Sequence, residues 1–225
     1  MSETLVGKLV TANRVLANEG IIRGVGHVSV REPGAEEMRI SRSRSPAFVT
    51  EDDVIRMDFD GNVLDDPDAN PYKETVIHRA IYRNRDDVNA VVHHHAPAVV
   101  PFTFTDVEIQ PTFHMAALFA DGVPTFADYD LDYGRLVVTE AEGERMAEVL
   151  GDRRAQLIEG HGANVTGGSL EAAVIATTVL VMNCEYQFQA ELLGGPRYFT
   201  DPEMVEATLE EAVLAPAVVE RIWEF

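Results

Sequence analysis

Three consecutive histidines, His93 to His95, end the apolar segment VNAVVHHH and are the chain's clearest candidates for metal chemistry. The valine-rich composition predicts a strand, and successive side chains of a strand point to opposite faces. His93 and His95 therefore project together, and two imidazoles on one face provide half of a divalent-metal site. His94 points the other way, so we expect it to have a structural or supporting role. An exposed histidine run is disfavoured because the preceding segment has the composition of a buried strand.

A catalytic metal usually has three protein ligands and one position open to water or substrate. His161 is the best third candidate, since it lies in a Gly-His-Gly sequence after the apolar segment QLIE. Flanking glycines allow the backbone to approach a ligand closely, although a histidine in such a turn is, taken alone, more often incidental. Imidazole ligands suit several divalent metals. We expect one ion per subunit, zinc, manganese, iron or cobalt, and the sequence does not select among them.

Glu74 begins the helical pattern of residues 73–83, which leads into the histidine strand. A carboxylate in the first turn of a helix commonly does no more than interact with the helix dipole. If the chain turns back from this helix onto the histidines, however, Glu74 lies beside a metal-bound substrate and can transfer a proton. Glu74 is therefore the candidate catalytic acid or base.

Hydrophobic spacing and turn residues divide the chain into helices and short strands within a single domain, residues 1–225. Apolar residues at helical spacing, capping residues and terminal glycines predict helices. Short apolar runs separated by Gly, Asp and Asn predict strands. Together they predict an α/β fold with helices on both faces of a central, mostly antiparallel sheet. The predicted helices are 5–18, 73–83, 140–150, 169–192 and one starting at 201–202; the predicted strands are a meander over 27–64 and the segments 88–95 and 156–159, with a turn over 160–168.

The 225-residue chain has 38 acidic and 18 basic residues and a formal charge of −20. Nucleic acids and acidic membrane surfaces are bound through Lys and Arg, so this charge argues against both as partners. The single cysteine, Cys184, cannot form a disulfide within the chain. The first residues show no secretory-signal pattern, and the longest apolar stretch, 172–182, is far shorter than the roughly 20 residues of a membrane-spanning helix. We therefore expect a soluble cytoplasmic protein.

Three segments together resemble the class II aldolase/adducin family, the group containing fuculose-phosphate aldolase and ribulose-phosphate 4-epimerase. They are EGIIRGVGHVSVR, PYKETVIHRAIYRNRDDVNAVVHHHAP and LIEGHGANVTGGSLEAAV, and the resemblance covers nearly the whole chain. It implies that His93, His95 and His161 are metal ligands and that Glu74 is the catalytic carboxylate. It also implies a three-layer α/β/α fold and a homotetramer with active sites between subunits.

The chain departs from the family's sugar-phosphate pattern at three places that cradle phosphate. It has Gly-His-Val-Ser at 26–29, Ser-Arg-Ser-Arg-Ser at 41–45 and Tyr-Lys at 72–73. Bulky and cationic side chains replace small donors, so we infer that the substrate is not a sugar phosphate. Arg and Lys match a carboxylate instead, although Arg44 is at least as readily a surface ion-pair partner. The candidate substrate contacts in these segments are His27, Ser29, Arg42, Arg44 and Lys73.

Two further residues are candidate substrate contacts and candidates for a contact across a subunit boundary. His114 lies in the apolar sequence PTFHMAALF, where a packed core histidine is the commoner outcome, and Tyr198 follows the long predicted helix. The forms HHHAP and FHMAALF resemble the family branch that includes decarboxylases of hydroxylated aromatic or pyridine carboxylates.

The sequence therefore predicts a metal-dependent carbon–carbon lyase, favoured as a decarboxylase of a non-phosphorylated hydroxy-aromatic or heteroaromatic carboxylate. One alternative is an aldolase or epimerase acting on a hydroxy-keto acid or sugar. A remote alternative is a non-enzymatic interaction module like the adducin head.

Overall fold

The computed structural model describes residues 4–209 and 213–225 and has a seven-stranded sheet at its centre. The strand order is β3-β2-β1-β4-β7-β6-β5, and every neighbouring pair is antiparallel except β5 and β6. The mostly antiparallel sheet that the sequence predicted is thus confirmed. The strands are β1 (His27–Val30), β2 (Glu37–Ser41), β3 (Val54–Asp58), β4 (Ala90–His94), β5 (Thr125–Phe126), β6 (Ala155–Ile158) and β7 (Gly162–Gly167).

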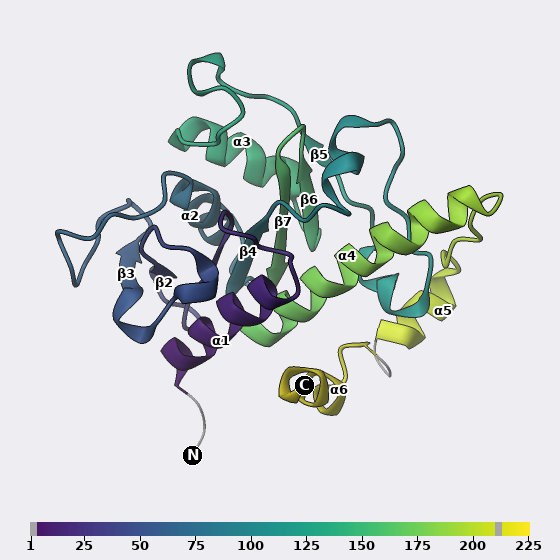
Figure 1. Ribbon diagram of the computed structural model, residues 1–225, viewed down its shortest axis with the longest axis horizontal. Coiled ribbons are helices and arrows are strands. Elements are labelled where there is room, and N and C mark those ends of the chain that lie inside the picture. The colour runs from purple at the N-terminus through teal and green to yellow at the C-terminus, as the bar shows by residue number, and fades with distance from the viewer. Residues whose placement is uncertain (1–3, 210–212) are drawn as a thin grey trace.

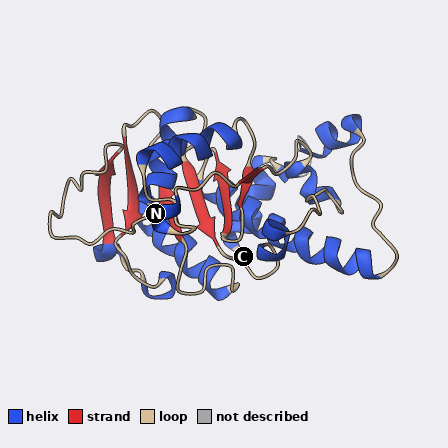
Figure 2. Ribbon diagram, turned by 90° about the horizontal axis from the view of Figure 1, so that it is seen from above, coloured by secondary structure: helices blue, strands red, loops and turns tan. Residues whose placement is uncertain are grey.

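Helices cover both faces of this sheet (Figures 1 and 2), which confirms the predicted three-layer α/β/α fold. One face packs against α2 and α3, and the other against α1 and α4. No helix within the described ranges has the length and apolar character needed to cross a membrane. The helices are α1 (Leu5–Asn18), α2 (Thr75–Asn84), α3 (Glu140–Leu150), α4 (Leu170–Leu192), α5 (Pro202–Thr208) and α6 (Pro216–Glu224).

A hydrophobic core lies on each face of the sheet, and the side chains of β4 alternate between these two cores. Val91 packs in the core beneath α2 and α3, whereas Val92 packs in the core with α1 and α4. Because side chains alternate along a strand, His93 faces the same side as Val91 and His94 the same side as Val92. All of them are fully buried. The separation of His94 from its two neighbours therefore follows the sequence prediction.

The helix ends agree with their sequence signals. Ser169 accepts a hydrogen bond from the backbone N–H of Ala172 and so caps α4. Thr139 and Glu142 form a reciprocal capping box at the start of α3. Gly151 follows α3 with a φ of 52°, which glycine adopts without a Cβ penalty. These residues therefore define where α4 begins and where α3 begins and ends.

Two predictions of local structure are wrong. Residues 162–167, predicted as part of a turn, form β7, because they pair with β4 on one side and β6 on the other. Only residues 159–161 turn the chain between β6 and β7. The last segment predicted for the meander, NVLD, contributes only a single bridge between Met57 and Val63. The helix predicted to start at 201–202 is confirmed as α5, but it is not the last helix, because Pro216 begins α6.

Candidate metal centre and catalytic cleft

Three histidines from separate parts of the chain meet where β4 ends. His93 lies on β4, His95 follows the strand, and His161 lies in the turn that leads into β7. Since β4 and β7 are antiparallel neighbours, with His94 opposite Ala163, the end of β4 lies beside the start of β7 (Figure 1). One nitrogen from each of the three imidazoles lies within 4.8 Å of the other two. The fold thus brings together the three residues that the sequence predicted as a metal-binding set.

Hydrogen bonds behind two of the rings orient their lone pairs. The amide nitrogen of Asn164 contacts Sδ of Met146 at 3.2 Å, which leaves the amide oxygen 2.7 Å from Nδ1 of His93. An amide oxygen only accepts hydrogen bonds, so Nδ1 of His93 carries the proton and Nε2 keeps its lone pair. Nδ1 of His161 likewise donates to the carbonyl oxygen of Arg135 at 2.6 Å. Such partners fix the tautomer and ring orientation of metal-binding histidines.

The donor set fits a divalent metal ion. Nε2 of His93 and Nε2 of His95 lie 3.1 Å apart, close to the roughly 3.3 Å expected between two nitrogens that each bind a tetrahedral zinc at about 2.0–2.1 Å. Burial, together with the nearby His161, lowers the pKa of His95 to about 4. Burial also lowers the pKa of His93 and of His161. The rings are therefore neutral at neutral pH, as metal binding requires.

Glu74 stands immediately before the first residue of α2, and its carboxyl group lies beside the histidines. Its Oε1 is 3.7 Å from Nε2 of His161 and accepts a hydrogen bond from the backbone N–H of Val137 at 3.1 Å. Burial raises the pKa of Glu74 to about 7, although the Val137 hydrogen bond opposes this shift. A carboxyl group with such a pKa can donate or accept a proton near neutrality.

An open cleft of about 430 Å³ gives access to His95, His161 and Glu74. Lys73 also lines it and is exposed, while Tyr72 and Leu136 contribute apolar surface. Small-molecule sites usually have volumes of roughly 300–1,000 Å³. The cleft therefore has the size of a small-molecule site. The imidazoles of His95 and His161, the carboxyl group of Glu74 and the cation of Lys73 all line it.

Among the two candidates on β1, His27 lines the cleft and Ser29 does not. His27 pairs with His93 across β1 and β4, and the two rings stack with centroids 4.9 Å apart. Ser29 is fully buried, and its Oγ lies 2.6 Å from His78 and 2.8 Å from the hydroxyl of Tyr82. The prediction that Ser29 contacts the substrate directly is therefore corrected, because its hydroxyl group is buried and already hydrogen-bonded to His78 and Tyr82.

The two candidate arginines bind a carboxylate of the protein itself. Arg42 and Arg44 reach the same Oδ1 of Asp53, at 2.6 and 3.3 Å. Neither lines the cleft, and both border a separate surface depression beside it. Their predicted contact with substrate is therefore corrected to an intramolecular ion pair, the alternative that the sequence left open for Arg44. Lys73 alone of the three predicted cations lines the cleft.

His114 and Tyr198 lie outside the cleft of their own chain. His114 is exposed beside Phe113, with the two ring centroids 5.9 Å apart, and so is not the packed core residue that its apolar neighbours favoured. The hydroxyl of Tyr198 donates to Glu191 at 3.2 Å, near the C-terminal end of α4. A contact with the cleft of a neighbouring subunit remains a prediction for both residues.

Sequence reasoning missed three residues at the site. Asn164 is paired with His93 in the β4–β7 register, and a turn over 160–168 offered no register from which to find it. His78 follows Glu74 by one helical turn, so helix spacing was a usable signal. The ring of Tyr72 lies 4.7 Å from that of His27, centroid to centroid, although the sequence showed it only as a departure from a phosphate-binding pattern.

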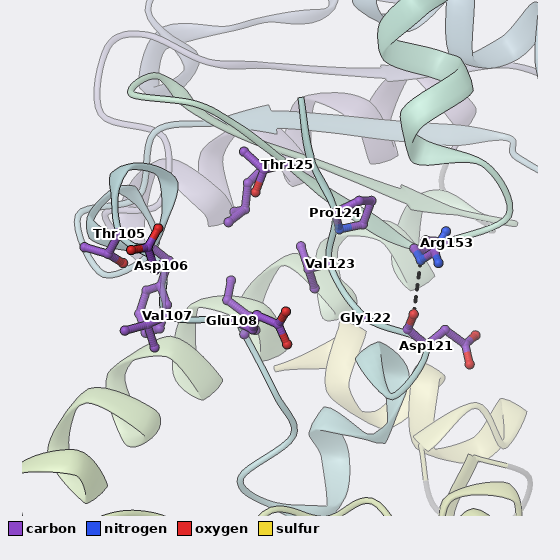
Figure 3. A pocket seen from close by; sticks show the side chains of 13 residues that line it. Thr105, Asp106, Val107, Glu108, Asp121, Gly122, Val123, Pro124, Thr125 and Arg153 are labelled. Carbon is purple, nitrogen blue, oxygen red and sulfur yellow. Dashed lines mark hydrogen bonds between the residues drawn. The ribbon is translucent and has the colours of Figure 1, made fainter. Parts of the chain in front are cut away.

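A second cavity, of about 410 Å³, lies beside the edge strand β5 (Figure 3). Segments 105–109 and 121–125 form most of its wall, and Nε of Arg153 donates to the carbonyl oxygen of Asp121 at 3.1 Å. None of the predicted site residues lines this cavity. The cleft beside His95 and His161 is therefore the candidate functional site.

Known proteins similar to this chain include both decarboxylases and aldolases. The family model described as Class II Aldolase and Adducin N-terminal domain matches residues 7–188. A 3,4-dihydroxyphthalate decarboxylase from Arthrobacter keyseri is 31% identical over 211 residues, which cover 87% of this chain and 82% of that protein. A 5-deoxy-D-ribulose 1-phosphate aldolase from Bacillus thuringiensis serovar kurstaki is 26% identical over 201 residues, covering 88% and 90%. A solved aldolase II superfamily protein from Pseudomonas syringae has a TM-score of 0.81 at 25% identity, covering 98% and 89%.

Proposed function

Because the chain belongs to the class II aldolase and adducin family, we propose that it is a metal-dependent carbon–carbon lyase. Its favoured reaction is the decarboxylation of a non-phosphorylated hydroxy-aromatic or heteroaromatic carboxylate. The observation that carries this proposal is the convergence of His93, His95 and His161 beside the buried carboxyl group of Glu74. The decarboxylase and aldolase relatives support a lyase of one of these two kinds.

His93, His95 and His161 would together hold one divalent ion, with zinc, manganese, iron and cobalt as candidates. When bound, such an ion supplies a Lewis acid that polarises substrate oxygens and accepts charge as the bond breaks. The chain's own contribution is to keep these imidazoles neutral and oriented, through Asn164 and the carbonyl group of Arg135.

Glu74 would deliver the proton that decarboxylation requires. The neutral carboxyl group of Glu74 first protonates the ring carbon of the phenolate that bears the carboxylate, which gives a dienone. The bond between that carbon and the carboxylate then breaks, CO2 leaves, and the electron pair returns to the ring and its oxygen, which restores the phenolate. The N–H of Val137, which donates to Oε1, stabilises the carboxylate that results. Water in the open cleft can return the proton for the next turnover.

The lining of the cleft favours an aromatic acid as the small-molecule partner. Lys73 has no ion-pair partner among the described residues and can attract a carboxylate. Tyr72 and Leu136 provide apolar surface against which a ring can lie. Since Arg42 and Arg44 bind Asp53, the support from cations comes from Lys73 alone. The named activity of the Arthrobacter relative, on a dihydroxyphthalate, supports the same class of substrate.

Aldol cleavage or epimerisation of a hydroxy-keto acid or sugar is the second candidate, and the aldolase from Bacillus thuringiensis favours it. The same imidazoles and Glu74 serve either reaction, because retro-aldol cleavage and decarboxylation both leave an enolate-type electron pair on the substrate. A non-enzymatic adducin-like module is disfavoured, since the complete set of imidazoles and Glu74 is present.

We also propose a cytoplasmic homotetramer in which a neighbouring subunit completes each cleft. The exposed ring of His114, which lies outside its own cleft, is available for such a contact. Light scattering on the purified protein gives the subunit number. A dimer or monomer at assay concentration would contradict the tetramer without affecting the proposed chemistry.

Metal analysis and product analysis together test the proposed reaction. The purified chain should contain about one divalent ion per subunit and should release CO2 from at least one hydroxybenzoate, hydroxyphthalate or pyridine carboxylate. A chelator, or the substitution His93→Ala or His161→Ala, should remove both the metal and the turnover. Aldehyde release without CO2 would favour the aldolase alternative, and turnover that survives both treatments would remove the metal from the mechanism.

A further inference from the structure

A buried row of four side chains leads from the cleft into the protein between β1 and α2. Nδ1 of His27 lies 2.6 Å from Nε2 of His78, and Nδ1 of His78 lies 2.6 Å from Oγ of Ser29. Oγ of Ser29 is in turn 2.8 Å from the hydroxyl of Tyr82. None of these four residues is more than 2% exposed. Each link is therefore a hydrogen bond whose donor must come from the row itself.

Tyr82, at the inner end of the row, determines which group donates and which accepts in each of these hydrogen bonds. The hydroxyl of Tyr82 has one proton, and Oγ of Ser29 is the acceptor within reach in the described part of the chain. Burial raises the pKa of Tyr82, whereas its contact with the backbone of Val91 lowers it. Among the described residues, the hydroxyl of Tyr82 has no hydrogen bond to an acceptor other than Oγ of Ser29. Tyr82 consequently donates to Ser29.

Once Tyr82 is the donor, the donor and acceptor atoms of Ser29, His78 and His27 are determined in turn. Ser29 accepts from Tyr82 and donates its own proton to Nδ1 of His78. Burial lowers the pKa of His78 to about 3, so its ring is neutral and has a single N–H, which must lie on Nε2. That N–H donates to Nδ1 of His27, whose own proton must therefore be on Nε2. The opposite direction would leave the hydroxyl proton of Tyr82 buried without an acceptor, which costs free energy.

We infer that His27 is a catalytic residue that presents an Nε2–H donor to an oxygen of the bound substrate, and that Ser29, His78 and Tyr82 are positioning residues that keep the proton on that nitrogen. The inference rests on the proposed function for the identity of the substrate. It also excludes His27 as a metal ligand, although His27, Glu74 and His93 have ligand atoms within 4.8 Å of one another. One ring nitrogen of His27 is protonated and the other accepts from His78, so neither has a free lone pair.

The donor would act as the carbon–carbon bond breaks. Once Glu74 has protonated the ring carbon, the electron pair released by departing CO2 moves through the ring onto the oxygen of the substrate, where negative charge accumulates. A fixed N–H aimed at this oxygen binds the transition state more strongly than the ground state, without giving up its proton. Glu74 supplies the proton to carbon, so the two residues have separate roles.

Neutron crystallography of the perdeuterated, zinc-loaded protein tests the direction directly. We expect deuterium on Nε2 of both His27 and His78 and on neither Nδ1, with the hydroxyl deuterium of Tyr82 directed at Ser29. Deuterium on Nδ1 of His27 would overturn the inference. This readout does not depend on activity, so it remains decisive even if the chain releases CO2 from none of the acids tested, an outcome that would contradict only the proposed decarboxylation.

Substitutions of Ser29 test the positioning role in the active enzyme. Ser29→Ala removes the donor to His78 and should lower kcat about tenfold, the effect of one lost hydrogen bond, with unchanged metal content. Ser29→Thr keeps the hydroxyl group and should restore most of the loss. His27→Gln, which retains a donor of different geometry, should impair turnover more than Ser29→Ala. Wild-type kcat in folded Ser29→Ala protein would overturn the positioning role.

Discussion

Asn164 and His93 face each other across β4 and β7, and the amide oxygen of Asn164 lies 2.7 Å from Nδ1 of the imidazole. This hydrogen bond determines which nitrogen of His93 retains a lone pair, because the amide oxygen accepts the proton of Nδ1. The opposite end of the same amide contacts Sδ of Met146 on α3. A helix on one face of the sheet thereby controls the orientation of a candidate metal ligand on β4.

We predict that Asn164→Leu lowers zinc affinity by about 10–100-fold, the usual cost of losing a partner behind a metal-binding histidine. Competition with a chromophoric chelator measures this affinity. Gln156→Leu is the matched control. Gln156 lies on β6 opposite Asn164 of β7 and is equally buried, but its amide donates to the backbone carbonyl oxygen of Met146 and contacts no histidine. It should reduce stability but not affinity, and an equal loss in both variants would contradict the proposed role of Asn164.

His94 and His95 provide a test in which adjacent residues should behave differently. His95→Ala should abolish stoichiometric metal binding, because it removes one of three ligands. His94→Ala should retain the metal, since that ring lies on the opposite face of the sheet, where its Nδ1 accepts from the N–H of Ala96. His94 is fully buried, so its truncation should lower the melting temperature. Elemental analysis and thermal melts on both variants measure these effects, and loss of metal from His94→Ala would contradict the assignment.

Glu74→Gln should lower kcat by about 10²–10⁴-fold, as expected when a general acid is removed, while the metal content remains unchanged. Glutamine preserves the acceptor for the N–H of Val137, so the local backbone should be undisturbed. Glu37→Gln is a suitable control because Glu37 pairs with Arg56 at the surface, away from the cleft. Full turnover in Glu74→Gln would assign the proton transfer to another group.

The parts of the site that were predictable from the sequence depend on short-range geometry. The pairing of His93 with His95 follows from strand alternation, and the ends of α3 and α4 follow from capping residues. The roles of Ser29, Arg42 and Asn164 depend instead on pairings across the fold. Arg42 reaches Asp53 only because β2 and β3 are paired. The sequence pattern identified it as a cation but did not show that a carboxylate was already beside it.

The segment 160–168 shows how a local signal can mislead. Its glycines indicate a turn, yet a Cβ at Gly162 would lie 2.3 Å from the carbonyl oxygen of His94, and one at Gly167 would lie 2.5 Å from the backbone nitrogen of Ala173. These glycines are therefore explained by close backbone approach within the sheet and beneath α4, as in strands that lie tightly against a neighbour. Only the tertiary structure distinguishes this use of glycine from its use in a turn.

Lys73→Met should reduce kcat/KM about fivefold for a substrate with a carboxylate near this side chain, mainly through KM. The expected loss corresponds to one solvent-accessible charge interaction of about 1 kcal/mol. Because screening weakens such interactions, the wild-type value should also fall with added salt while that of the variant changes less. Lys8→Met, which removes a cation paired with Glu171 away from the cleft, is the control. Equal kinetics for Lys73→Met and wild type would exclude this contact.

Asp53 should make folding stability depend on pH. Burial of its carboxyl group opposes ionisation, but hydrogen bonds from Thr50 and Arg42 and the charge of Arg44 outweigh it and hold the pKa below the usual 3.8. The unfolded chain therefore binds this proton more readily than the folded chain, so stability rises with pH. The contribution is complete above about pH 5 and disappears as the pH falls below 3.8 through the lower folded-state pKa.

Asp53→Asn should consequently be less stable than wild type by about 1–3 kcal/mol at pH 7, because it leaves donors of Thr50 and Arg42 poorly satisfied. The two melting temperatures should differ by several degrees at pH 7 and converge as the pH is lowered through this range. Asp52→Asn changes an exposed neighbour on the same turn and should melt like wild type at pH 7. A gap between wild type and Asp53→Asn that stays constant down to pH 3 would show that the charge of the Asp53 carboxylate does not contribute to stability.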